Sequence, residues 1–258
     1  MKKTVVTVLV VVLLALGLLV SCVGGIVKGS GNLATEGFNF SDFTHVDVGS
    51  AFEVEIAQSD SYSVSVITDD NLLDYVLVSK QGTTLKIRLK SASYISTTAR
   101  AEITMPQLHD LDLSEATQGT VSGFSSGGNI DIKVSGASSL DLIDMSVGDV
   151  KLNISGASRV NGDIKAIDVN FDISEASTVQ LQGSANDIDV DTSGASHMEL
   201  ATFPVNNADI KFSGASSGTV NLDGRLNADL SGASNLKYIG EPTIEDINIS
   251  SASTVSKG

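Results

Sequence analysis

The 258-residue sequence is poor in several residue types that define other classes of protein. A single cysteine excludes a disulfide framework and any multi-cysteine metal or iron–sulfur site. Three prolines, no tryptophan and only 5% aromatic residues predict a core of Val, Ile, Leu and Ala rather than large rings. Basic residues are also scarce, because 16 Lys and Arg stand against 31 Asp and Glu. Such an acidic chain argues against a nucleic-acid-binding protein, since phosphate backbones need a Lys/Arg surface.

The first 22 residues have the pattern of an export segment that ends in the single cysteine. Lys2 and Lys3 precede an apolar run from Thr4 to Val20, which is shorter than the roughly 20 residues that a membrane-spanning helix needs. The run ends in Leu19-Val20-Ser21-Cys22, which resembles the lipobox of bacterial lipoproteins. We therefore predict a lipoprotein signal peptide over residues 1–21 and a lipid anchor at Cys22. The alternative is an uncleaved membrane anchor in which Cys22 is an ordinary apolar residue.

The remaining chain divides by composition. Residues 22–37 are rich in Gly and other small residues, and we predict a flexible tether. Residues 38–258 are predicted to form one domain, with irregular N-terminal rungs or a cap over 38–105 and regular rungs over 106–258. Removal of residues 1–21, which contain two Lys and no acid, changes the net charge from −15 to −17.

A four-residue motif of small residues recurs eight times at intervals of 18–21 residues. The copies begin at Ser114, Ser135, Ser155, Ser174, Ser193, Ser213, Ser231 and Ser250. Such a period is typical of a solenoid. Apolar residues alternate with polar ones before each motif, as at Ile132 and Val134, and again after it, as at Leu140 and Leu142. Period-two alternation indicates strands, so the sequence predicts an all-β, single-stranded parallel β-helix with rungs of about 20 residues.

The motif itself is predicted to form the corner between two strands. Ala stands third in every copy, and we expect it to point into the bend. The second position holds Gly five times, but also Glu115, Glu175 and Ser251. Because Glu replaces Gly there, we expect ordinary backbone geometry and a solvent-facing side chain. The hydroxyls at the first and fourth positions are expected to form ladders between rungs.

Two segments resemble the head GIN domain family of auto-transporter adhesins. One is AEITMPQLHDLDLSEA, residues 101–116, which leads into the repeated motifs, and the other is FTHVDVGSAFEVEI, residues 43–56. The resemblance covers about residue 40 onwards. It implies a right-handed parallel β-helix on a secreted or lipid-anchored bacterial envelope protein, and it implies no set of catalytic residues.

The outward positions before each motif carry mostly Asp and Asn. Asp187, Asp189 and Asp191 place three acids on one strand face and are candidate oxygen ligands for Ca²⁺. Lys133 and Lys211 occupy the same columns, so we favour a solvated face that opposes association between sheets. No metal ion or cofactor is predicted.

These observations predict a non-enzymatic cell-envelope lipoprotein that presents a rigid surface, either as an adhesin or as a protein-binding module. Its expected partners are the membrane, through Cys22, and a protein or surface glycan, with self-association through the C-terminal edge. The membrane face that it occupies stays open. One alternative is a carbohydrate-active enzyme resembling polysaccharide lyases, which would need long loops for which the short rungs leave little room. Another is a periplasmic scaffold or regulatory partner of an envelope-sensing system.

Overall fold

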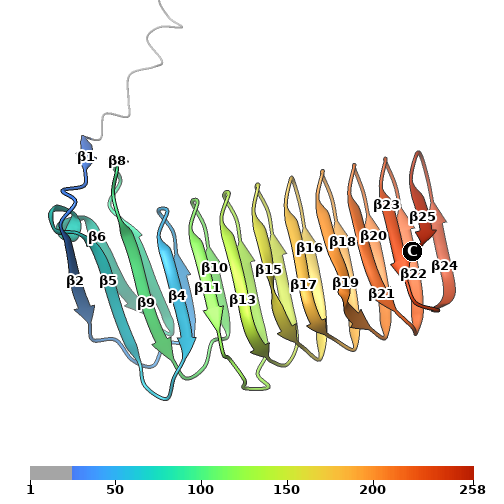
Figure 1. The fold of residues 1–258 in the computed structure, drawn as a ribbon, viewed down its shortest axis with the longest axis horizontal. Helices are drawn as coiled ribbons and strands as arrows, with labels where there is room; N and C mark the ends of the chain where they lie inside the picture. Colours follow the sequence, from blue (N-terminus) through green and yellow to red (C-terminus); the bar gives the residue numbers. More distant parts are fainter. Residues whose placement is uncertain (1–24) are drawn as a thin grey trace, which may run out of the picture.

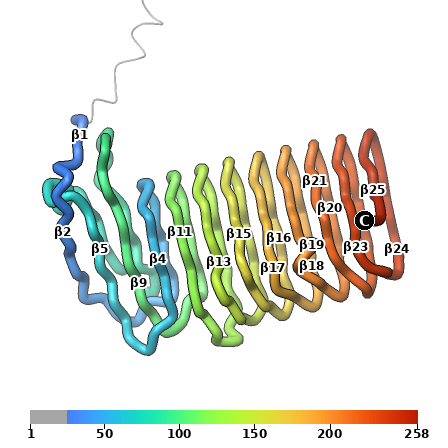
Figure 2. Tube along the Cα trace, in the orientation of Figure 1, coloured from blue at the N-terminus to red at the C-terminus, as the bar shows by residue number. Residues whose placement is uncertain are grey.

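The structure is a computed structural model that describes residues 25–258, so the predicted signal peptide and Cys22 lie outside the described residues. The described part is a parallel β-solenoid of stacked rungs, as Figures 1 and 2 show, and it confirms the predicted all-β fold. Its one helix is η1, a 3₁₀ helix over Asp70–Tyr75. No helix among these residues is long and apolar enough to span a membrane.

Two large sheets make up the solenoid, and each regular rung contributes one strand to each sheet. Sheet I has 11 strands, in the spatial order β6 (Val76–Gln81), β7 (Thr84–Leu89), β3 (His45–Val48), β10 (Asp110–Leu113), β12 (Ile130–Val134), β14 (Val150–Ile154), β16 (Asp168–Ile173), β18 (Asp187–Thr192), β20 (Asn207–Phe212), β22 (Arg225–Leu230) and β24 (Thr243–Ile249).

Sheet II has 12 strands, in the order β2 (Leu33–Phe38), β5 (Ser63–Asp69), β9 (Ala99–Met105), β4 (Glu53–Gln58), β11 (Gln118–Ser122), β13 (Ser139–Ser146), β15 (Arg159–Lys165), β17 (Thr178–Ser184), β19 (His197–Val205), β21 (Ser217–Leu222), β23 (Asn235–Ile239) and β25 (Thr254–Lys257). A small third sheet pairs β1 (Ile26–Lys28) with β8 (Ser93–Ile95).

The core lies between the two large sheets and follows from the period-two pattern. In β16, Val169, Phe171 and Ile173 are buried while the alternate residues are exposed. Parallel pairing in register places equivalent inward-facing side chains of successive rungs above one another. Phe171 therefore lies between Leu152 of β14 and Val190 of β18. The predicted inward pattern weakens in β24, where Ile249 is 48% exposed. Within the described residues, β24 pairs on one side only, with β22.

The N-terminal part of the domain combines two early rungs with an antiparallel cap. One rung consists of β3 and β4, which stack in register beneath β10 and β11. Another consists of β7 and β9, and the antiparallel strands β2, β5 and β6 cover its far side. Residues 49–52, between β3 and β4, occupy the place of the repeated motif. This corner departs from the motif because Gly49 replaces the first-position Ser and Phe52 replaces the fourth-position hydroxyl residue.

The prediction of a flexible tether over residues 22–37 is wrong for the two stretches of this segment that form strands. Strand β1 pairs with β8, and β2 forms a six-residue antiparallel ladder with β5. The sequence of β2, LATEGF, has no clean alternation, so its strand character was not visible. The two strands pair because β5 would otherwise be an edge strand. Without β2, the backbone N–H and C=O groups along that edge of β5 would lack hydrogen-bond partners.

Asp69 fastens this N-terminal segment to the cap. Asp69 directly precedes η1, but its carboxylate makes no capping hydrogen bond to that helix. The carboxylate instead accepts hydrogen bonds from the backbone N–H groups of Gly31, at 2.7 Å, and Thr98, at 2.8 Å. These two bonds favour the ionised form and hold the pKa of Asp69 below its ordinary value.

We expect Asp69→Asn to lower the melting temperature at neutral pH. The folded-state pKa of Asp69 lies below that of the unfolded chain, which is about 3.9. The stabilisation is therefore complete above that value and is lost as the pH falls through the folded-state pKa. The difference in melting temperature between wild type and variant should shrink in acid, measured by circular dichroism between neutral pH and pH 3. Asp60→Asn, at an exposed aspartate, is the control, and a constant difference across this range would contradict this role of Asp69.

Candidate functional site

The repeated corners have left-handed backbone geometry at their second position. All eight residues there have positive φ angles, from 57° to 79°, including Glu115, Glu175 and Ser251. The prediction of ordinary backbone geometry is therefore wrong. A Glu at this position does not exclude left-handed geometry. The left-handed conformation costs a non-glycine residue only about 1–2 kcal/mol, which neighbouring contacts can offset.

The two other predictions for the motif are also corrected. The third-position Ala is exposed in every copy, and the fourth-position Ser or Thr is the residue that points into the bend. The hydroxyls do not form ladders with one another. In six copies the fourth-position hydroxyl donates to the first-position carbonyl of its own corner, at 2.7–2.9 Å. In these six rungs the corner is thus closed by a buried hydroxyl.

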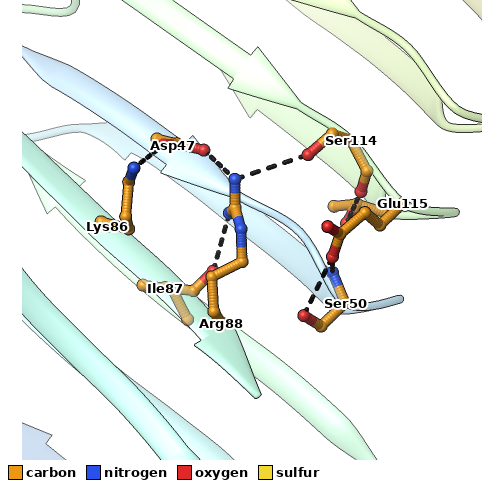
Figure 3. Close-up of polar contacts among 8 residues, drawn as sticks. Asp47, Ser50, Lys86, Ile87, Arg88, Ser114 and Glu115 are labelled. Carbon is orange, nitrogen blue, oxygen red and sulfur yellow. Dashed lines mark hydrogen bonds and ion pairs between the residues drawn. The ribbon is translucent and has the colours of Figure 1, made fainter. Parts of the chain in front are cut away.

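Glu115 shows how one left-handed corner is supported. Its carboxylate accepts hydrogen bonds from the backbone N–H of Ser50, at 2.9 Å, and from the Ser50 hydroxyl, at 3.1 Å (Figure 3). Ser50 itself has a φ of 64°, so two strained corners lie against each other and share these bonds. Glu115 is therefore a structural residue that clamps the first two corners.

An ion-pair cluster lies beside this clamp on the outer face of sheet I (Figure 3). Asp47 of β3 pairs with Lys86, at 2.9 Å, and with Arg88, and Arg88 also reaches the Ser114 hydroxyl at 3.4 Å. Asp112 of β10 stands next to Asp47 in the same column. Burial raises the pKa of Asp112, and the charge of Asp47 raises it further, while Arg88 acts in the opposite direction. The cluster ties three strands of the N-terminal rungs together.

The structure brings His45 into an arrangement that the sequence did not reveal. Its Nδ1 lies 2.8 Å from the Thr83 hydroxyl, and its Nε2 contacts Asp110. A hydroxyl, an imidazole and a carboxylate in this order resemble a hydrolase triad. However, the adjacent backbone N–H groups of Thr44 and His45 both donate to the Thr83 carbonyl, at 3.0 Å, so these donors are not free to stabilise an oxyanion. The three side chains clamp the turn between β6 and β7 onto β3 and β10.

The candidate calcium ligands do not converge. Asp187, Asp189 and Asp191 all point outward from β18, and alternate residues of a strand lie about 6.6–6.8 Å apart along its axis. Asp187 already accepts an amide hydrogen bond from Asn207, at 2.8 Å. Among residues 25–258, no group of three His, Cys, Asp or Glu side chains is arranged to hold a metal ion. Hydrogen bonding between rungs is the role that the structure shows for Asp187.

A groove lies on the outer face of sheet II. Its volume is about 630 Å³, and it crosses the strands from β11 to β19. Asn161 donates to Asp141, at 3.0 Å, and Gln182 donates to Asp163, at 3.2 Å. The polar residues that line it are Thr120, Asp141, Asp144, Asn161, Asp163, Gln180, Gln182 and Thr202. The lining contains three carboxylates and no Lys or Arg.

Irregularities in two strands border this groove. Strand β13 has a bulge between Leu142 and Met145, where Asp144 has a φ of 52°, and β19 has a register shift between Leu200 and Pro204. Bulges bend a strand and re-aim its side chains, and they are enriched near functional sites. The sequence did not predict this groove, because a bulge inside an alternating strand leaves little trace in the apolar pattern.

The described residues thus place the chain among the parallel β-solenoid proteins, with polar outer faces on both large sheets. Residues 42–242 match the family model described as "Putative auto-transporter adhesin, head GIN domain". The chain belongs to this family, which confirms the resemblance seen in residues 43–56 and 101–116. No curated protein matches the sequence.

Solved structures from two Parabacteroides species share the fold. A putative adhesin from Parabacteroides distasonis is 22% identical with a TM-score of 0.85, covering 91% of this chain and 100% of that one. A putative adhesin from Parabacteroides merdae is 20% identical with a TM-score of 0.81, covering 90% and 99%. A putative lipid binding protein from Parabacteroides distasonis is 20% identical with a TM-score of 0.80, covering 91% and 100%. At these identities the likeness shows the fold alone.

Proposed function

We propose that this chain is a non-enzymatic bacterial envelope lipoprotein that binds a partner through the groove on sheet II. Family membership supports the adhesin-like role. The observation that carries the proposal is the groove itself, because it combines carboxylates and amides in fixed positions on a stack of hydrogen-bonded strands. A preorganised surface loses little conformational entropy on binding, which favours recognition over catalysis by mobile loops.

A matched pair of substitutions in one rung tests the groove. Gln180 of β17 lies in the groove, and Asn170 of β16 lies on the opposite sheet, and both are exposed outward-facing positions. We expect Gln180→Arg to reduce binding of the fluorescently labelled domain to intact bacterial envelopes at least tenfold, while Asn170→Arg leaves binding unchanged. Equal binding by both variants and wild type would contradict the proposal.

Chemical or enzymatic treatment of the envelopes before the same binding assay distinguishes a protein partner from a glycan partner. Loss of binding after protease treatment indicates a protein partner, and loss after periodate oxidation indicates a surface glycan. Binding that survives both treatments and is unaffected by Gln180→Arg counts against recognition by the groove.

The anchor is tested separately from the groove. Cys22 lies outside the described residues, and the case for its lipidation rests on the sequence around it. Several buried acyl chains hold a protein stably at a membrane, at about 0.8 kcal/mol per methylene. Metabolic labelling with an alkyne-modified palmitate should mark the wild-type protein in the membrane fraction. Cys22→Ala should abolish the label and release the chain from that fraction, and a labelled Cys22→Ala protein would contradict the anchor.

A further inference from the structure

The small sheet of β1 and β8 projects from the N-terminal end of the solenoid, beside the point where the described chain begins (Figure 1). We call the sheet and its flanking residues, 25–31 and 90–98, the foot. Ile26 is 72% exposed and Ile95 is 50% exposed, whereas apolar side chains of this size elsewhere in the early rungs are mostly buried. The foot therefore presents two large aliphatic side chains to solvent.

The charge of the foot is opposite to that of the rest of the chain. Its two segments contain Lys28 and Lys90 and no Asp or Glu, although acidic residues outnumber basic ones 31 to 16 in the whole sequence. The negative carboxylates of Asp69 and Asp70 accept hydrogen bonds from residues 30, 31 and 98, which are the ends of the foot that join the cap. The Lys90 ammonium donates to the Asp74 carbonyl and is exposed. Exposed Ile with flanking Lys is suited to the boundary between water and an anionic lipid surface.

We propose that the foot contacts the surface of the membrane that holds the lipid anchor. This inference rests on the proposed lipidation of Cys22. Ile26 is the fourth residue after Cys22, and a fully extended chain over those four steps spans at most about 14 Å. A lipidated Cys22 thus keeps Ile26 and its paired strand next to the bilayer, where the two isoleucines lose contact with water and the lysines meet phosphate groups.

The contact also orients the solenoid. The loop that contains β8 joins β7 to β9, so it lies at the same edge of its rung as residues 49–52 and the repeated corners. Figure 2 shows the corners and the foot on one edge and the return loops on the other. With the foot on the membrane, the corner edge faces the bilayer and the groove on sheet II is directed sideways.

A single fluorescent probe tests the contact in the full lipidated protein. The native sequence has one cysteine, whose sulfur is used by the anchor, so an introduced cysteine is the only free thiol. Ile95→Cys carries an environment-sensitive dye in the foot. Ile167→Cys is the matched control, because Ile167 is 52% exposed and lies between β15 and β16 at the return-loop edge. The protein is placed in phosphatidylcholine vesicles with and without phosphatidylglycerol and with a lipid-borne quencher.

The dye at position 95 should shift to the blue and be quenched several-fold more strongly than the dye at position 167, and phosphatidylglycerol should increase the difference. Ile26→Cys provides a second site in the foot with the same expected result. Equal quenching at positions 95, 26 and 167 in a protein whose mass shows the lipid would overturn the foot and leave the anchor intact. An unmodified Cys22 in the mass spectrum would overturn the anchor, and the foot with it.

Discussion

Phe171→Ala is expected to lower the free energy of unfolding by about 3–5 kcal/mol, the largest effect of any single substitution considered. The ring is 1% exposed and lies in the central column between Leu152 and Val190. Truncation leaves a cavity that the neighbouring rungs cannot close, because the hydrogen-bonded strands of both sheets fix the spacing of the rungs. Denaturant unfolding monitored by circular dichroism measures the loss.

Asn170→Ala is the control for this prediction, because Asn170 precedes Phe171 on the same strand and points to solvent. Its effect should stay within about 0.5 kcal/mol. Since a solenoid can unfold from one end, hydrogen exchange should show the loss of protection spreading over the rungs next to β16. A Phe171→Ala protein as stable as Asn170→Ala would refute the assignment of Phe171 to the core.

Gly194→Ala is expected to destabilise the protein by about 2–5 kcal/mol. Gly194 has a φ of 76°, and a left-handed conformation costs an L-residue about 1–2 kcal/mol. A Cβ atom at this position would also lie 2.4 Å from the carbonyl oxygen of Glu175 in the preceding corner. Relief of that overlap requires the backbone of one corner to shift, which adds a packing penalty of about 1–3 kcal/mol. The melting temperature and the denaturant midpoint both report the change.

The converse substitution tests the same geometry. Glu175 adopts the left-handed conformation with a φ of 65° despite its Cβ atom. Glu175→Gly should therefore be neutral or stabilise the protein by up to about 1 kcal/mol. A protein in which Gly194→Ala is harmless and Glu175→Gly is strongly destabilising would not have left-handed corners at these positions.

The stacked part of the fold was predictable because one physical rule sets it. Each strand buries alternate residues, so the period-two pattern that contains Phe171 and Ile173 identifies both the strands and their inner faces. The fixed interval between motifs then implies that equivalent strands stack. Family membership confirms this interpretation, and the matched region begins near the first early rung.

The corners were predicted in the right place but with the wrong geometry. Residue preference alone cannot show that Glu115 recovers its conformational cost through two hydrogen bonds to Ser50, which is 65 residues away. The fourth-position side chain, rather than Ala, turned out to be buried because its hydroxyl can satisfy a carbonyl at the bend. Ala has no polar group that could replace this contact.

The surface features depend on contacts between distant parts of the sequence. The His45 arrangement draws Thr83 and Asp110 from different rungs, and the foot pairs residues 26–28 with residues 93–95. The groove on sheet II depends on a bulge at Asp144 that an alternating pattern does not reveal. The local apolar pattern is enough to identify the strands of each rung. The surface features depend in addition on which residues of neighbouring rungs are paired, and a local pattern does not show this pairing.

The most direct test of the proposed function is photocrosslinking in living cells. A benzophenone amino acid replaces Gln180 in the groove or, as the control, Asn170 on the other sheet of the same rung. We expect a discrete crosslinked product from position 180 that is absent at position 170 and that is lost with Cys22→Ala, as the proposed lipidation requires. Identical crosslinking patterns from the two positions, or products from position 170 alone, would contradict the claim that this protein acts by presenting the groove on sheet II to a partner.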